Sequence, residues 1–465
     1  MKRFAALTLV SVVTFSGLVA CTGDASENER KATTEVREVE CPDDVEAAVL
    51  ESHSCSEVDL PDGSSMFVLR VEPPSPSEAS PVVVLGTNLG SAPDYGGLAP
   101  VAQRTGRVAL ITDLPGTAHS TPLLDCPEVS ALSGPAASDP VGAFRGVVAA
   151  VSACKDRLSS AGVHPQDVSV AGAAADLHAM VTAMGLEQVI ALSAGTTGTV
   201  GVTWAQQHPE DLEAMVLDTP LFTAPPLVRR SNAIIEAVAR DCAADPACTK
   251  KYGDVTASWS SALKSLRSQP LPAASGTLRL QINATLFRRA IFWLSGRGQG
   301  GAGLVPSLLA DATNGTTAGL LDEFAADLIR TPPYCTGYLP KCQFGELAYG
   351  AALAYNCPTM AGDLVWTDIC AAWGTPAGDP FTNRVVDVPT LVLLGRYNGF
   401  STTAETKAAL GRAVPEAFYL VTPSGAHNVL GEQCMREIRS SWLAGDVTRP
   451  PADTDCLDQQ RLDFP

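Results

Sequence analysis

The chain has 465 residues, of which 46% are hydrophobic and 18% are charged, so it is long enough for one large globular domain with an insertion or for two domains. Its formal net charge of −18 argues against the clustered basic surface that nucleic-acid binding requires. Composition and charge do not identify a substrate.

The N-terminus has the features of an export signal. Lys2 and Arg3 precede a moderately apolar run that ends in "LVAC" at Cys21. This ending resembles the lipobox of bacterial lipoproteins, which implies that residues 1–20 are removed and that lipidated Cys21 anchors the protein outside the cytoplasm, on the cell membrane. An ordinary secretory signal with a chance cysteine is the alternative. Residues 21–45 are polar and aperiodic, and we expect a flexible tether there.

The cysteines also indicate an exported protein. Setting Cys21 aside from the thirteen cysteines leaves twelve, which fall into short-range couples in chain order. A metal site is the competing use, but no close CxxC pair is followed by a second one at zinc-like spacing, so we expect no metal there. The predicted disulfides are Cys41–Cys55, Cys126–Cys154, Cys242–Cys248, Cys335–Cys342, Cys357–Cys370 and Cys434–Cys456.

Short apolar runs alternate with helical patterns along the body of the chain. Such runs are typical of buried parallel strands, so we predict a parallel sheet with helices on both faces. The expected strands are 81–85, 107–112, 188–192, 214–217, 389–394 and 417–421, and the expected flanking helices are 173–184 and 196–208.

The alternation stops near residue 220 and resumes near residue 385. The stretch between contains helical patterns at 231–241 and 255–267 together with Pro- and Gly-rich turns, which predicts a mostly helical cap inserted into the sheet domain. The expected organisation is a core at 46–221, a cap at 222–384 and a second part of the core at 385–465.

One expected strand runs into a small-residue turn. Residues 191–195 read Ala-Leu-Ser-Ala-Gly, close to the G-x-S-x-G pattern of a nucleophile elbow. A serine at such a turn lies at the carboxyl edge of the sheet, near helix N–H groups that stabilise an oxyanion. We therefore predict Ser193 as the nucleophile and the Ala194 N–H as part of the oxyanion hole. Alternatively, Ser193 is only the N-cap of the next helix.

Three longer stretches resemble the secreted tripeptidyl-aminopeptidase-like branch of the α/β-hydrolases. They are "DLPGTAHSTPLLDC" at 113–126, "LSAGTTGTVGVTWAQQHPEDLEAMVLD" at 192–218 and "GAHNVLGEQC" at 425–434. The resemblance runs in order from about Cys41 to the end of the chain. It implies an α/β-hydrolase fold, with a mostly parallel sheet flanked by helices and an inserted helical cap. It also implies a serine nucleophile relayed through a histidine to a carboxylate.

His427 is the predicted general base. It lies in a loop of small residues just after the last expected strand, where a sheet-edge serine can meet it. His119 also follows a strand and is the rival.

Two positions depart from the family pattern. Asn398 stands where the family has its catalytic Asp, and an amide does not stabilise a protonated imidazole as a carboxylate does. Asp218 is the alternative acid, and Asp368 is a weaker candidate. The oxyanion loop of the family is glycine-rich, whereas residues 86–90 read Gly-Thr-Asn-Leu-Gly, which leaves Thr87 and Asn88 as its candidates.

Three functions stay open at this point. The first is an exopeptidase of tripeptidyl-aminopeptidase type that acts on peptide N-termini through an acyl-enzyme on Ser193. The second is an esterase or other acyl hydrolase, because a fold does not fix the leaving group. The third is a surface lipoprotein with impaired catalysis that binds a peptide or partner.

Acidic residues in the expected cap distinguish the first two functions. Asp322, Glu323 and Asp327 suit the ammonium group of a peptide substrate, and they equally suit a solvated helix face. We expect a monomer with no cofactor, a peptide or small ester as substrate, and no nucleic-acid partner.

Overall fold

The computed structural model describes residues 34–465, except 76, 87–92, 133–139, 166, 223–225, 276–277, 298–299, 316–318, 331–347, 360–363, 376–383 and 428. Three predicted features, Cys21, the Cys335–Cys342 pair and the loop residues Thr87 and Asn88, lie outside the described residues. In the part of the chain that is described, no helix is long and apolar enough to cross a bilayer.

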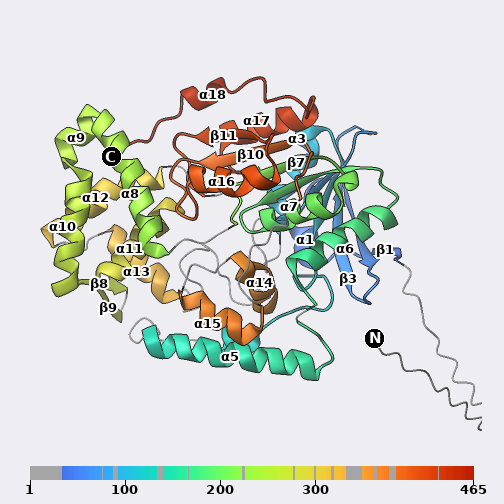
Figure 1. Cartoon of the computed structure of the whole chain (residues 1–465), viewed down its shortest axis with the longest axis horizontal. Coiled ribbons are helices and arrows are strands. Elements are labelled where there is room, and N and C mark those ends of the chain that lie inside the picture. The colour runs from blue at the N-terminus through green and yellow to red at the C-terminus, as the bar shows by residue number, and fades with distance from the viewer. Residues whose placement is uncertain are drawn as a thin grey trace, which may run out of the picture.

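A nine-stranded sheet forms the centre of the molecule (Figure 1). Strands β5, β4, β6, β7, β10 and β11 pair in parallel, and β1, β2 and β3 extend the sheet in antiparallel fashion. All six strands expected from the apolar runs are confirmed. The order across the sheet is β1 (Val36–Val39), β2 (His53–Asp59), β3 (Ser65–Val71), β5 (Ala109–Thr112), β4 (Val82–Val84), β6 (Val189–Ala194), β7 (Leu212–Asp218), β10 (Thr390–Gly395) and β11 (Phe418–Thr422).

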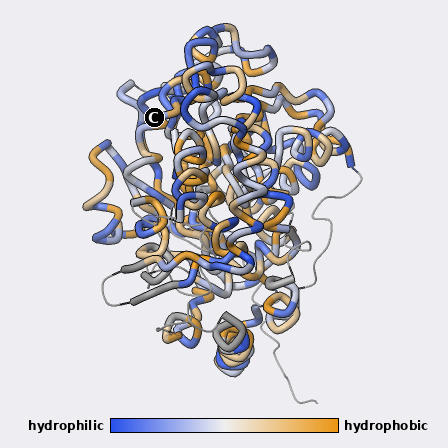
Figure 2. The backbone as a smooth tube through the Cα atoms, turned by 90° about the vertical axis from the view of Figure 1, so that its left-hand side faces the viewer, coloured by the Kyte–Doolittle hydropathy of each residue, from blue (hydrophilic) through white to orange (hydrophobic). Residues whose placement is uncertain are grey.

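Helices bury both faces of this sheet, because strand residues alternate between the two sides. Ala191 and Met215 contribute to one buried cluster, and Ile190 and Val216 to the other. Figure 2 shows hydrophobic stretches through the middle of the molecule. The first face is covered by α5 (Pro140–Ser160), α6 (Val170–Ala183), α7 (Thr197–Gln207) and α16 (Thr403–Ala413), and the second by α1 (Asp43–Ala48), α2 (Tyr95–Leu98), α3 (Pro100–Thr105), α17 (Gln433–Ala444) and α18 (Asp455–Asp458).

The expected tether at 21–45 was wrong in its second half. Residues 36–39 form β1, the outermost strand of the sheet, paired with β2. Arg37 is 2.8 Å from Glu57 and 2.9 Å from Asp59, and a disulfide joins Cys41 to Cys55. These cross-links order a segment whose polar sequence gave no strand signal.

The expected cap divides into two parts. Its first part forms a separate lobe with its own hydrophobic core, on the left in Figure 1. This lobe includes an antiparallel hairpin that the helical patterns did not predict. Its elements are α8 (Leu227–Ala244), α9 (Pro246–Tyr252), α10 (Val255–Ser268), β8 (Leu271–Ser275), β9 (Leu278–Ile282), α11 (Ala284–Ser295), η2 (Gly301–Leu304), α12 (Val305–Asn314) and α13 (Leu320–Arg330).

The second part returns to the sheet domain, so the predicted cap boundary at 384 was too late. Helices α14 (Tyr349–Asn356) and α15 (Leu364–Trp373) lie beside α5 in Figure 1, and Tyr349, Leu353 and Trp373 are buried in the sheet-domain core. The turn η3 (Cys357–Thr359) joins them. A helical pattern shows that a segment buries one face, but not which core that face meets.

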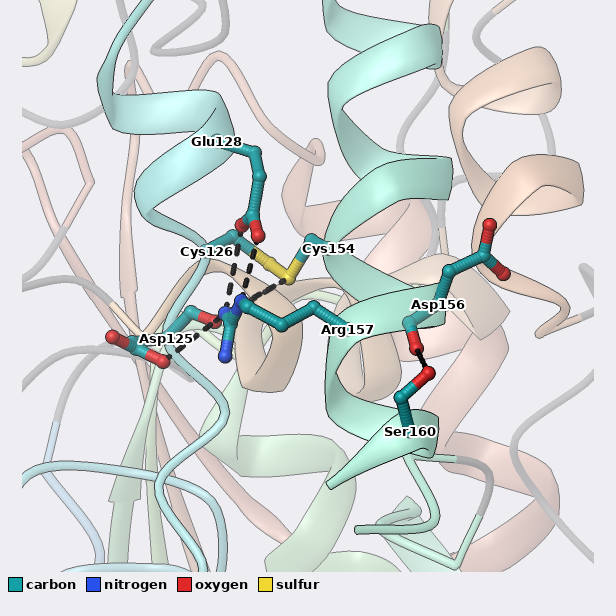
Figure 3. A network of polar contacts seen from close by, with 7 residues as sticks. All are labelled: Asp125, Cys126, Glu128, Cys154, Asp156, Arg157 and Ser160. Carbon is teal, nitrogen blue, oxygen red and sulfur yellow. Dashed lines mark hydrogen bonds and ion pairs between the residues drawn. A yellow bond between two sulfur atoms is a disulfide. The ribbon is translucent and has the colours of Figure 1, made fainter. Parts of the chain in front are cut away.

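Five of the six predicted disulfides are confirmed, namely Cys41–Cys55, Cys126–Cys154, Cys242–Cys248, Cys357–Cys370 and Cys434–Cys456. Figure 3 shows one of them, which joins the N-cap residue of α4 (Pro127–Ser130) to α5. Beside it, Arg157 of α5 donates to the Glu128 carboxylate at 2.6 Å and to the Asp125 carbonyl at 2.8 Å. The disulfide and these polar contacts fasten the same two helices.

Candidate active site

The carboxyl ends of four neighbouring strands bring the candidate residues to one edge of the sheet. Register pairs Ala194 of β6 with Asp218 of β7, and Asp218 with Leu393 of β10. Gly395, the last residue of β10, pairs with Thr422 of β11. The turns that carry Gly195, Asn398 and His427 therefore leave the sheet from this carboxyl edge, where α/β folds place their ligands.

Ser193 is not at this edge. Its side chain shares a sheet face with Ala191, the face that α7 covers, and it is 0% exposed. Its hydroxyl donates weakly to the Val216 carbonyl at 3.5 Å. The same oxygen lies 2.7 Å from where a Cβ atom on Gly201 of α7 would stand. A hydroxyl enclosed between strand and helix does not reach a substrate, so the structure does not support the predicted nucleophile.

Gly195 occupies the sharp turn between β6 and α7. It is the residue at positive φ, 56°, in the segment from β6 through α7. Its N–H donates to the Asp218 carbonyl and its carbonyl accepts from the Leu221 N–H, both at 2.9 Å. In a nucleophile elbow the strained turn residue is the one whose side chain projects over the sheet edge. In this chain the residue in that place is a glycine.

The small residues of the elbow are therefore those around Gly195. Ser193 and Thr197 stand two positions before and after it, where the pattern requires small side chains. Thr197 Oγ1 accepts from the Ala194 N–H at 2.9 Å and donates to the Gly86 carbonyl at 3.0 Å. Because its N–H is already bonded, Ala194 does not serve as the predicted oxyanion donor. In a nucleophile elbow the residue after the turn position supplies an oxyanion-hole N–H, and in this chain that residue is Thr196.

Asn398 lies in the turn after β10, as the sequence predicts for the acid position, and is 5% exposed. Its Oδ1 accepts from the Phe400 N–H at 3.0 Å, which fixes the orientation of the amide. Its Nδ2 is buried and has no hydrogen-bond partner among the described residues. Asn398 therefore offers a donor at the edge, where a catalytic acid offers an acceptor.

His427 lies in the loop after β11. Its ring centroid is 4.2 Å from that of Phe400, and its Nδ1 is buried without a hydrogen-bond partner among the described residues. Burial lowers the pKa of the imidazole from 6.5 to about 4, because desolvation disfavours the charged form. The ring is therefore neutral at physiological pH, and in the described part of the chain no carboxylate orients it.

Asp218 forms a hydrogen bond with the backbone of the loop that carries His427. Its Oδ1 accepts from the Val429 N–H at 3.0 Å and from Thr219 Oγ1 at 2.8 Å. The side chain is 0% exposed, and desolvation raises its pKa from 3.8 to about 6. Its Oδ2 has no partner in the described structure, and it forms no hydrogen bond with His427. The contacts of Asp218 are those of a positioning residue, not of a triad acid.

The rival base and the weaker acid lie elsewhere. Nδ1 of His119 is 3.0 Å from the Asp113 carboxylate, and its Nε2 is 3.2 Å from Asp44 of α1. The hydrogen bond with Asp113 raises the pKa of His119. The contacts of His119 with Asp113 and Asp44 tie the loop after β5 to α1. Asp368 is exposed on α15.

The predicted acidic group of the cap is only partly described. Glu323 of α13 pairs with Arg297 at 2.6 Å, Asp322 is half-buried on the same helix, and the Asp327 side chain lies outside the described residues. The pair with Arg297 is the arrangement of a solvated helix face.

The comparison with protein families agrees with this architecture. Residues 80–433 match the family model described as alpha/beta hydrolase fold. A proline iminopeptidase from Mycobacterium smegmatis is 15% identical, with a TM-score of 0.40 over 88% of this chain and 97% of that one. An esterase from Thermogutta terrifontis is 13% identical, with a TM-score of 0.38 over 82% and 93%. A carboxylesterase from Bacillus subtilis is 11% identical, with a TM-score of 0.39 over 85% and 92%. No curated protein matches the sequence.

Proposed function

The chain belongs to the alpha/beta hydrolase fold family, and from that premise we propose that it binds a peptide or a related acyl compound at the carboxyl edge without forming an acyl-enzyme. The expectation of a hydrolase family is confirmed, and the neighbours named above are hydrolases by name. The observation that carries the proposal is Gly195 in the elbow, because a glycine has no side chain to attack a carbonyl carbon.

The other two positions of a triad support the same proposal. Asn398 replaces the acid, and in an unrelated serine protease that exchange lowers turnover by about 10⁴-fold. His427 lies after β11 as expected, but among the described residues it has neither a nucleophile to activate nor a carboxylate to orient it. Exopeptidase or esterase chemistry through Ser193 requires its hydroxyl to leave the contact between β6 and α7.

The groups that remain suit an uncharged ligand group. His427 is neutral, Asn398 offers an amide donor, and Phe400 offers an aromatic face beside them. A carbonyl accepts hydrogen bonds from such donors. A peptide bond or an ester fits this set better than a carboxylate or a phosphate does.

The test uses trialanine and ethyl butyrate as probes of the peptide and ester classes. We expect saturable binding of at least one by calorimetry with the full chain, and no product after prolonged incubation. His427→Ala should weaken binding about tenfold, which corresponds to one hydrogen bond, while the exposed His164→Gln should have no effect. Hydrolysis of either probe, or no saturable binding of both, would contradict the proposal.

A further inference from the structure

Three metal-ligating side chains meet on the molecule away from the carboxyl edge. His178 lies on α6, His208 is the C-cap of α7, and Asp211 ends the turn η1 (Pro209–Asp211) that leads into the amino end of β7. One ligand atom from each lies within 4.8 Å of the other two. We propose that these residues form a binding site for a divalent transition metal, with Zn²⁺ as the representative ion.

The carboxylate is the fixed member of the group. Asp211 is 5% exposed, and its Oδ2 accepts from Nε1 of the fully buried Trp204 at 2.8 Å. Both of its oxygens are 3.0 Å from Nδ1 of His178. Metal ligands are typically oriented in this way by hydrogen bonds from a second layer of residues. A metal ion bound by His178 and Asp211 would take the place of the contact between Nδ1 and the carboxylate.

The second imidazole stacks on the first. The rings of His178 and His208 are 3.9 Å apart with an interplanar angle of 7°. Nδ1 of His208 is 3.5 Å from the Glu210 carboxylate, which adds negative potential beside the site. Because stacked rings direct their lone pairs along parallel planes, one ring must turn out of the stack for both nitrogens to reach one ion.

The chemistry of the set fits a transition metal and leaves room for solvent ligands. Two imidazole nitrogens and one carboxylate form a common protein donor set for Zn²⁺, with water in the fourth position. The side chains of His178 and His208 are 38% and 24% exposed, so an ion enters directly from solvent. Every described cysteine is in a disulfide, so none of them offers a thiol that would compete for the metal.

An ion at this place would join α6 to the end of α7. The two helices pack side by side on one face of the sheet, and α7 is the helix that follows the Gly195 turn. A ligand that binds only the folded state raises the melting temperature in a concentration-dependent way. The site would thus stabilise the fold without contacting the carboxyl edge, and the inference does not depend on the proposed function.

The experiment titrates Zn²⁺ into the full chain after chelator treatment, with calorimetry and thermal unfolding as readouts. We expect one equivalent to bind and the melting temperature to rise. His178→Gln and His208→Gln, both at solvent-accessible positions, should each weaken binding by at least about tenfold. His164→Gln, at an exposed histidine before α6, is the matched control and should bind like the wild type.

A second readout reports the ligands directly. Co²⁺ in place of Zn²⁺ should give the visible absorption of a tetrahedral or five-coordinate site, and both histidine variants should lose it. The proposal is overturned if no saturable binding occurs, if both histidine variants bind as the wild type does, or if His164→Gln weakens binding as much as they do.

Discussion

At Gly195 the backbone adopts a φ of 56°, a conformation that glycine tolerates more readily than any residue with a side chain. Its backbone hydrogen bonds, which include those to the Asp218 carbonyl and from the Leu221 N–H, hold the turn without help from a side chain. The scaffold of an elbow is therefore retained where its reacting group is missing. Together with Asn398, this residue is the basis of the proposal that the protein binds its ligand without forming an acyl-enzyme.

Restoring both side chains should restore chemistry. We expect Gly195→Ser with Asn398→Asp to hydrolyse an activated ester at least about 10²-fold faster than Gly195→Ser alone, because the acid orients and stabilises the imidazolium of His427. Serine at a positive φ costs about 1–3 kcal/mol of stability, so folding is checked alongside. Ser193→Ala in the double variant is the control and should leave the rate unchanged. Loss of the rate in that control would show that Ser193 reacts.

His427 should make stability fall in acid. Its pKa is about 4 in the folded chain and about 6.5 when unfolded, so the unfolded chain takes up more protons between these values. The wild type should lose at most about 3 kcal/mol of unfolding free energy as the pH falls from 7 to 4 through this group.

Urea denaturation at several pH values checks this contribution. His427→Gln should show a shallower loss than the wild type between pH 6.5 and pH 4. The raised pKa of Asp218, about 6, acts with the opposite sign, because it makes stability fall as the pH rises from 4 to 6. Asp218 is present in both proteins, so its contribution cancels in the comparison. Parallel profiles for the two proteins would contradict the assignment.

At the scale of elements, the packing of α7 on β6 explains the burial of Ser193. A helix approaches a strand closely only where facing side chains are small, and here Ser193 faces Gly201. Gly201→Ala should therefore destabilise the fold by about 1–3 kcal/mol despite the better helix propensity of alanine.

A variant of Ser193 tests the contact between Ser193 and residue 201 directly. Ser193→Ala should recover much of that loss in the Gly201→Ala background, since it removes the oxygen 2.7 Å from the new Cβ. Gly411→Ala in α16 is the matched control, because nothing lies within 4 Å of its Cβ position, and it should be neutral or stabilising. Urea unfolding measures the wild type, the two single variants at residues 193 and 201, their double variant and Gly411→Ala, and additive effects at residues 193 and 201 would contradict the packing.

The sequence predicts the parallel strands well because each is a continuous apolar run, as doubly covered strands must be. Asn398 and His427 directly follow such runs, and both lie in loops at the carboxyl ends of β10 and β11, whereas their roles stay predictions. The elbow was misassigned by two residues, because a pattern that requires a serine selects Ser193 and passes over Gly195. The missing signal was tertiary, namely that the strand residue before the turn packs beneath the helix against Gly201.

Other elements were missed for different physical reasons. Strand β1 is only four residues long, two of them charged, and ion pairs and a disulfide fasten it to β2. Helices α14 and α15 lie in the same stretch of sequence as the cap helices, but their apolar side chains are buried in the sheet-domain core. Sequence patterns indicate that a segment is buried, whereas three-dimensional packing decides which core it is buried in.

At the scale of the whole molecule, the cap lobe rests on the loop that carries Asn398. Arg396 pairs with Asp241 of α8 at 2.5 Å, and the ring of Phe292 on α11 is 4.7 Å from that of Phe400. A Cβ on Gly399 would come within 2.7 Å of Phe292. The cap and the carboxyl edge thus share one close interface, so a ligand at the edge lies beside the cap.

Anchoring is a property of the whole chain that we propose from its N-terminus. If Cys21 is the lipidated residue, Cys21→Ser should move the protein from the membrane fraction to the soluble fraction, because two acyl chains supply most of its membrane affinity. Fractionation followed by immunoblotting measures this. Cys335→Ser is a suitable control and should leave the protein with the membrane. Retention of the Cys21 variant by membranes would contradict the anchor.

The most direct test of the account is labelling of the full chain with a fluorophosphonate, followed by peptide mapping across all its serines. The reagent needs an activated serine but no knowledge of the substrate. We predict no adduct on Ser193 or at the carboxyl edge of the wild type, and an adduct at position 195 in the Gly195→Ser, Asn398→Asp variant. An adduct on Ser193 of the wild type, abolished by Ser193→Ala, would contradict the account.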